Sequence, residues 1–192
     1  MSSYIVRYLL NKSIISYEDK ELYDYGIFIM MSYKIFFIIS FLFGVVLKIP
    51  FSSVLFYVAF CLIRNFTGGI HAKSEIKCNI LTTISILISI IFIKSLVKYE
   101  SIYVAVAMLI MSSVSLCVIK PVASSSKKIS PKEQLNFHKK AIMIILLILL
   151  ISIISLIVGI YNIVVSLSIG VSLANILLIL GKLQQKINKK LN

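Results

Sequence analysis

The stretch AIMIILLILLISIISLIVGI, residues 141–160, decides the class of fold. It carries no charged residue, and its apolar side chains run on without the polar alternation of a membrane β-strand. About 20 apolar residues make a helix long enough to cross the hydrocarbon core of a bilayer. Helices and closed barrels are the structures that satisfy every backbone polar group inside that core. The stretch therefore predicts a membrane-spanning α-helix.

Five more apolar segments extend the pattern over the rest of the chain. Hydrophobic residues make up 59% of the 192 residues and charged residues 14%, against about 25% charged in a soluble domain. A soluble fold would have too little polar surface to cover itself. We predict one all-α integral-membrane domain over residues 1–192, a polytopic helical bundle of about six transmembrane helices. The other predicted spans are 27–47, 50–66, 79–97, 102–119 and 162–181.

The span predicted over 50–66 is the shortest. Its apolar run from Phe51 to Ile63 ends at Arg64 and would form about 20 Å of helix, less than the roughly 30 Å hydrocarbon core. The helix must continue toward Phe66, or the loop after it must dip into the membrane. In both cases residues 64–78 lie at or below the membrane interface.

The distribution of positive charge predicts the orientation. If the N-terminus is inside, the outside loops hold three of the 20 Lys and Arg residues, namely Lys48, Lys94 and Lys98. Cytoplasmic loops carry the excess of Lys and Arg in membrane proteins. We therefore predict a multi-pass cell-membrane protein whose two termini and 64–78 segment are cytoplasmic.

The N-terminal segment, residues 1–25, has charges scattered through it and no long apolar core, unlike a cleavable signal peptide. Its apolar residues suggest an amphipathic helix on the cytoplasmic membrane surface. An ordinary lead-in to the first span is the alternative. The apolar residues concerned are Ile5, Tyr8, Leu9, Ile14 and Ile15.

The segment RNFTGGIHAKSEIKC, residues 64–78, gathers reactive side chains in an otherwise apolar chain. It holds one of the two histidines and one of the three cysteines. Cys61 and Cys117 lie inside apolar spans, where cysteine behaves as a small hydrophobe. Cys78 follows Lys77 at the start of a predicted span, where positive charge and a helix N-terminus favour the nucleophilic thiolate. A reducing cytoplasm would keep this thiol free.

A cysteine and a histidine are the minimal pair for covalent acyl transfer, because imidazole takes the thiol proton and returns it to the leaving amine. On one continuous helix His71 and Cys78 would lie about 10 Å apart along the axis, whereas a hydrogen bond needs about 3 Å. The chain must therefore turn between them. We predict that Gly68 and Gly69 supply a permissive backbone for this turn, and amides that face an oxyanion. An ordinary tight connection is the alternative reading of the Gly-Gly pair.

Other roles for these residues stay open at this point. A zinc site needs three or four protein ligands, and the loop offers only His71, Glu75 and Cys78, without a CxxC pair or a second local histidine. We predict no metal and no cofactor. A purely structural role for His71 and Cys78 is the other alternative.

The segment 120–140, KPVASSSKKISPKEQLNFHKK, is the one long polar connection. Its Pro and Ser content disfavours a helix, and its charge is strongly positive. It would contact anionic lipid, or bind an acidic peptide, or do both. The net charge of +13 favours acidic partners through electrostatic steering. We predict no nucleic-acid partner.

The pattern R-x3-GG-x-H-x6-C, formed by Arg64, Gly68, Gly69, His71 and Cys78, resembles the AgrB family of accessory gene regulator proteins. The likeness continues over most of the chain. Glu21 and Tyr25-Gly26 resemble the family's lead-in to the first span, and Pro121-Val122 with Lys127 and Lys128 resembles its basic loop.

The resemblance implies a membrane cysteine endopeptidase that acts on an AgrD-like quorum-sensing propeptide with an acidic C-terminal tail. The tail is removed, the peptide is held as a thioester on the cysteine, and an internal thiol or hydroxyl closes a thiolactone or lactone. By carry-over, Cys78 is the nucleophile and His71 the general base and acid, with Arg64, Gly68 and Gly69 shaping the site. Candidates to orient His71 are Asn65, Ser74 and Glu75, and candidates to bind the tail are Lys73, Lys77, Lys127 and Lys128.

Two rival classes remain. A small transporter would need spans broken by Gly or Pro and more charge inside the membrane, of which Lys34 is one instance. A non-catalytic bundle that binds lipid or peptide would tolerate loss of Cys78. A homodimer is a further possibility, since the short spans need lateral cover.

Overall fold

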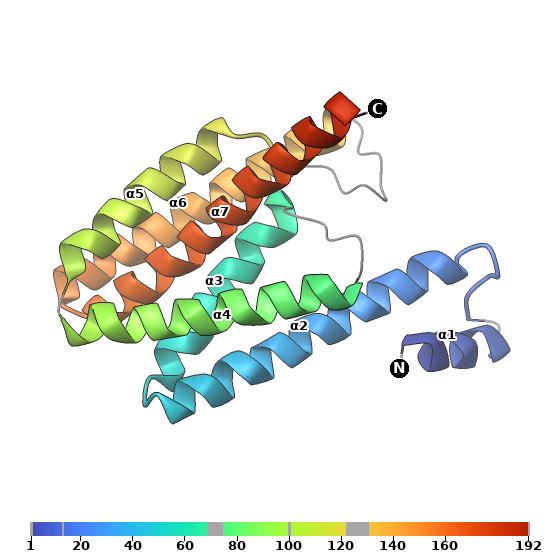
Figure 1. The fold of residues 1–192 in the computed structure, drawn as a ribbon, viewed down its shortest axis with the longest axis horizontal. Helices are drawn as coiled ribbons and strands as arrows, with labels where there is room; N and C mark the ends of the chain where they lie inside the picture. The colour runs from blue at the N-terminus through green and yellow to red at the C-terminus, as the bar shows by residue number, and fades with distance from the viewer. Residues whose placement is uncertain (1, 13, 69–74, 100, 122–130, 192) are drawn as a thin grey trace. The chain divides into compact units, whose positions relative to one another are not determined.

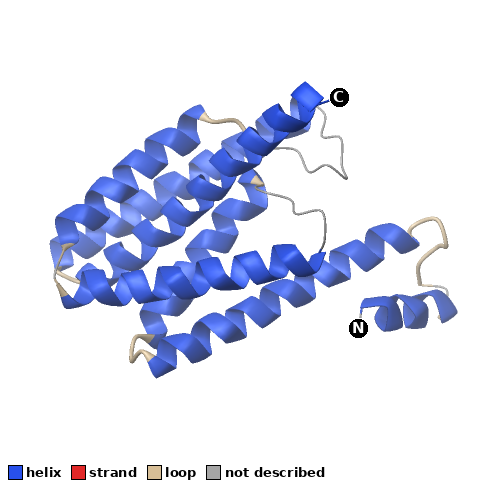
Figure 2. Cartoon of the chain, in the orientation of Figure 1, coloured by secondary structure: helices blue, strands red, loops and turns tan. Residues whose placement is uncertain are grey.

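The computed structural model describes residues 2–12, 14–68, 75–99, 101–121 and 131–191, and every regular element among them is an α-helix (Figures 1 and 2). The prediction of an all-α polytopic bundle is confirmed. The helices are α1 (Ser2–Asn11), α2 (Lys20–Val46), α3 (Pro50–Thr67), α4 (Glu75–Lys98), α5 (Ile102–Val118), α6 (Pro131–Val158) and α7 (Tyr161–Leu191).

The chain divides into two compact units, Met1–Ile39 and Ser40–Asn192, with the division inside α2. In the first unit, the Ser16 hydroxyl donates to Asp19 Oδ2 at 2.8 Å, and the Asp19 N–H donates to Ser16 Oγ at 3.3 Å. This reciprocal pair resembles a capping box, which satisfies N–H groups at a helix start. It lies immediately before α2.

The N-terminal segment is not one amphipathic helix. α1 ends at Asn11, so Ile14 and Ile15, predicted to belong to its apolar face, lie outside it. α2 then begins at Lys20, well before residue 27, where the first span was predicted to begin. Hydropathy identifies only the apolar part of a helix, so it did not predict the polar first turns of α2.

Five helices among the described residues are long and apolar enough to cross a membrane: α2, α3, α4, α6 and α7. The sixth predicted span, 102–119, is the apolar helix α5, which has 17 residues and a length of about 25 Å. α3 extends to Thr67, so the helix continues past Arg64 and Phe66, the first of the two possibilities that the short apolar run left open. α6 begins at Pro131, so residues 131–140 are helical, although they were predicted to belong to a polar connection. Proline is well tolerated at the first position of a helix because its missing N–H has no partner there in any case.

α7 is the central helix of the Ser40–Asn192 unit. It packs against α3, α4, α5 and α6, and Figure 1 shows it running alongside α3 and α5. The most apolar stretch of α7 is 72% buried within the protein, against 28% for that of α6. The lipid-facing helices therefore surround α7.

Small polar side chains join α5 to α7 inside this unit. The hydroxyls of Ser112 and Ser172 lie 2.9 Å apart, and the Ser115 hydroxyl donates to Asn175 Oδ1 at 2.8 Å. In a bilayer, helices are not drawn together by the hydrophobic effect, and interhelical hydrogen bonds of this kind contribute about 0.6–2 kcal/mol each. They fix the register of α5 against the central helix.

Gly170 allows α3 and α7 to approach closely. A Cβ atom added at Gly170 would lie 2.8 Å from the carbonyl oxygen of Phe56 and 3.0 Å from Cβ of Ala59. Small residues at such contacts let helix backbones pack directly against each other in membranes. The approach matters for function because α3 ends at Thr67, immediately before the GG-x-H sequence.

We expect Gly170→Ala to lower the free energy of unfolding by about 1–3 kcal/mol, because the added methyl group forces α3 and α7 apart. Denaturant unfolding of the full chain in detergent micelles would measure this. Gly26→Ala is the matched control, since nothing lies within 4 Å of a Cβ at Gly26 in α2. It should be neutral or slightly stabilising. Equal stability of the two variants would contradict the close approach.

Candidate active site

α3 ends at Thr67, and the chain changes direction at Gly68. The Thr67 hydroxyl donates to the carbonyl of Ile63 at 3.1 Å, and the Gly68 N–H donates to the carbonyl of Arg64 at 3.0 Å. Gly68 has a φ of 72°, a conformation that costs glycine little and strains other residues. Gly68 therefore has the kind of backbone conformation that the predicted turn would use.

Cys78 lies in the first turn of α4, which begins at Glu75. This agrees with the predicted place of Cys78 at the mouth of its span. Its side chain is partly buried and it is a free cysteine. Cys61, inside α3, and Cys117, exposed near the end of α5, are also free, but neither lies in the first turn of a helix. Cys78 is thus the cysteine that occupies a helix start.

Several predicted site residues lie outside the described residues, namely Gly69, His71, Lys73, Ser74, Lys127 and Lys128. For Glu75 and Lys77, α4 fixes the backbone position in its first turn. Asn65 is exposed on the last turn of α3. The described part of the site is therefore its frame, the end of α3 with Gly68 and the start of α4 with Cys78.

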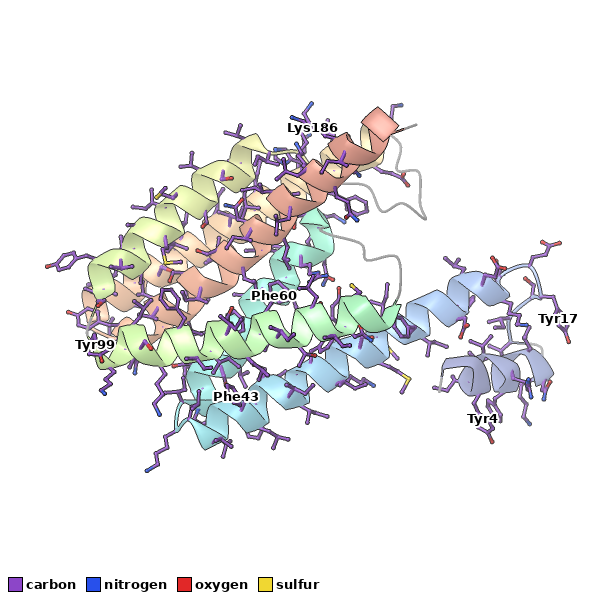
Figure 3. All side chains as sticks on the ribbon, viewed as in Figure 1. Tyr4, Tyr17, Phe43, Phe60, Tyr99 and Lys186 are labelled. Atoms are coloured by element: carbon purple, nitrogen blue, oxygen red, sulfur yellow. The ribbon has the colours of Figure 1, made fainter. Side chains whose placement is uncertain are left out.

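Arg64 lies in the last turn of α3, and its guanidinium carbon is 5.4 Å from the centroid of the Phe60 ring. That distance is within the range of a cation–π contact. Its Nη1 is buried and has no hydrogen-bond partner within the described part of the chain. A buried donor left without a partner costs about 1–3 kcal/mol, and more when the group is charged. Figure 3 labels Phe60, which is 2% exposed and anchors the guanidinium.

An aromatic contact ties the end of α3 to the start of α6. The rings of Phe66 and Phe137 have centroids 6.3 Å apart, and Lys140 Nζ lies 5.8 Å from the centroid of the Phe66 ring. The side-chain amide of Gln134 donates to the carbonyl of Pro121 at 2.7 Å, which joins the end of α5 to the same region. The end of α3, the end of α5 and the start of α6 therefore lie together at one end of the Ser40–Asn192 unit. In Figure 3, Lys186 marks this end and Tyr99 the opposite one.

Sequence reasoning missed this contact. Phe66 and Phe137 are far apart in the chain, and no local pattern pairs them. The Phe60–Arg64 contact did have a signal, because residues four apart on a helix lie on one face.

The sequence around these helix ends is strongly basic. The segments 64–78, 120–140 and 182–192 contain Glu75 and Glu133 as their acidic residues, against 13 lysine and arginine residues. Those whose side chains the structure describes are Arg64, Lys120, Lys132, Lys139, Lys140, Lys182 and Lys186. Such a charge balance attracts acidic ligands and repels basic ones. No group of three or more His, Cys, Asp or Glu side chains that could hold a metal lies together among the described residues.

These features define a class: an all-α, multi-pass membrane protein with a free cysteine at the start of a helix, beside a basic surface. The family model described as Accessory gene regulator B matches residues 2–180 of the chain. The chain belongs to the AgrB family, as the R-x3-GG-x-H-x6-C pattern predicted. No curated protein and no solved structure matches it. Membership assigns the chain to peptide processing in the accessory gene regulator system, with an AgrD propeptide as the implied substrate.

Proposed function

We propose that this protein is a membrane cysteine endopeptidase that removes the acidic C-terminal tail of an AgrD-type propeptide and cyclises the remainder to a thiolactone or lactone. The observation that carries the proposal is the position of Cys78. It is a free, partly buried thiol in the first turn of α4, and a six-residue stretch, 69–74, separates that helix from Gly68 at the end of α3.

In the first half of the reaction, His71 takes the proton of the Cys78 thiol, and the sulfur attacks the peptide carbonyl at the cleavage site. The tetrahedral intermediate then collapses, the C–N bond breaks, and His71 gives its proton to the departing amine of the tail. The peptide is left as a thioester on Cys78. The amides of Gly68 and Gly69 are the proposed donors to the oxyanion.

In the second half, a thiol or hydroxyl within the bound peptide loses its proton to His71 and attacks the thioester. The new ring bond forms, the bond to Cys78 breaks, and the enzyme thiol is regenerated with the returned proton. Attack from within the same peptide has an effective concentration far above that of an external nucleophile. Apolar helices that limit the access of water would suppress hydrolysis of the thioester. Asn65, Ser74 and Glu75 are candidates to orient His71.

We propose that the site faces the cytoplasm. Support comes from the Lys and Arg distribution, with Lys48 between α2 and α3, and Lys94 and Lys98 near the C-terminal end of α4, on the predicted outer side. The lysines proposed to bind the tail, Lys73, Lys77, Lys127 and Lys128, would draw in an acidic peptide tail and anionic lipid.

Trapping the thioester would test the mechanism. The full chain in lipid vesicles is mixed with an AgrD-type propeptide whose internal ring-forming nucleophile is replaced by alanine. Without ring closure, we expect the protein to gain the mass of the peptide minus its tail, at Cys78. Hydroxylamine should remove the adduct, because it cleaves thioesters.

The control variant is Cys117→Ala, which removes an exposed thiol of α5 and should still form the adduct. Tail release without any covalent adduct, or an adduct on Cys61 or Cys117, would contradict the assignment.

A further inference from the structure

Arg64 is held against Phe60, and one of its nitrogen atoms lacks a hydrogen-bond acceptor within the described residues. The ring of Phe60 fixes one face of the guanidinium, while Nη1 is buried and unpartnered within the described part of the chain. A guanidinium stays protonated in proteins and has five donors in a rigid fork. A cation kept in this state on the last turn of α3 indicates a binding group whose acceptor is supplied by another molecule.

The chemistry of that acceptor follows from the shape and charge of the surroundings. The planar fork of arginine matches the two oxygens of a carboxylate, with two parallel hydrogen bonds. The segments 64–78, 120–140 and 182–192 contain many lysines and only Glu75 and Glu133 as acids, so an incoming anion meets little repulsion. A neutral carbonyl would satisfy the hydrogen bond but would leave the positive charge unpaired.

We infer that Arg64 is a specificity-determining residue that binds a side-chain carboxylate in the tail of the peptide substrate. The inference rests on the proposed function and adds to it, because it assigns the selection of an acidic tail to one partly buried arginine rather than to the lysines alone. Arg64 lies four residues before Gly68, where the chain leaves α3. A carboxylate bound there would hold the peptide close to the frame of the site while the reaction takes place elsewhere.

The test compares two peptides and two variants of the full chain in lipid vesicles. One propeptide carries its natural acidic tail, and the other has every tail Asp and Glu replaced by Asn and Gln. Arg64→Met removes the fork and keeps much of the apolar stem. We expect it to raise KM for the acidic peptide by about 10- to 100-fold, the range for losing a charged hydrogen-bonded pair. KM for the amide peptide and kcat for both peptides should change less than about threefold.

Thermal unfolding distinguishes this role from a structural one, because the loss of a structural contact would lower the unfolding temperature. Nη1 has no hydrogen-bond partner within the described part of the chain, and methionine can still pack against Phe60, so Arg64→Met should unfold at the same temperature or higher. The matched control is Lys98→Met, which removes an exposed cation at the C-terminal end of α4 and should leave both KM values unchanged.

The outcomes separate the inference from the proposed function. If the unmodified protein cleaves neither peptide, the proposed function fails, and the inference with it. If it cleaves both and Arg64→Met impairs both equally, or lowers only kcat, carboxylate selection is wrong while the endopeptidase stands. The assays are run in vesicles of phosphatidylcholine alone and with phosphatidylglycerol added. An effect of Arg64→Met that appears only with phosphatidylglycerol would assign Arg64 to lipid phosphate and overturn the inference.

Discussion

Replacing Cys78 by alanine is expected to abolish release of the propeptide tail while the protein remains folded in the membrane. The thiol is the proposed nucleophile, and no other group in the mechanism can form the thioester. Loss of a covalent nucleophile lowers kcat by about 10⁶-fold in well-studied proteases. The substitution removes one partly buried sulfur atom, so its effect on stability should be small. Tail release is measured by mass spectrometry, and the amount of folded protein by size-exclusion chromatography in detergent.

Two further cysteines make the experiment specific. Cys61→Ala and Cys117→Ala each remove a thiol from an apolar helix and should process the propeptide at a rate close to that of the unmodified protein. Undiminished processing by Cys78→Ala would exclude the endopeptidase mechanism. That result is what a transporter or a non-catalytic binding bundle predicts.

Replacing His71 by glutamine is expected to slow tail release by about 10²- to 10⁴-fold, the usual contribution of a general acid–base. Glutamine retains a hydrogen-bonding side chain but cannot take up and return a proton near neutral pH. Residual activity should rise at high pH, because hydroxide generates the thiolate directly and no longer requires the base. The measurement is a pH profile of single-turnover tail release.

The second histidine serves as the control. His138 lies on α6, close in sequence to Phe137 and Lys140, and has no role in the proposed chemistry. His138→Gln should retain the full rate and the original pH profile. Equal loss in both variants would indicate that the histidines act through structure rather than proton transfer.

Much of the fold was predictable from local composition. Inside a bilayer the solvent is hydrocarbon, so an apolar run such as 141–160 predicts a helix, and a length of about 20 residues predicts that the helix crosses the membrane. The helix ends were less predictable. α2 begins at Lys20 and α6 at Pro131, earlier than hydropathy predicts, because the first turns of both helices are polar. α5, by contrast, was predicted to within one residue, as 102–119 against the observed Ile102–Val118.

The candidate site was predictable in part, for a similar reason. The position of Cys78 follows from where an apolar span begins, and the bend at Gly68 follows from a glycine pair at a span's end. The pairing of Phe66 with Phe137 has no such local cause, because it depends on how α3 and α6 pack. The unpartnered Nη1 of Arg64 likewise depends on what surrounds it in space.

By itself, the sequence determined that this chain is a helical membrane protein of the AgrB family, since hydrocarbon burial and the spacing of a few reactive residues are local properties. Only the tertiary structure decided which helix is central, how closely α3 approaches α7 at Gly170, and that Nη1 of Arg64 is buried without a hydrogen-bond partner among the described residues. Those features arise from contacts between residues distant in the chain. Each depends on the size and polarity of both partners at once, so no single segment specifies it.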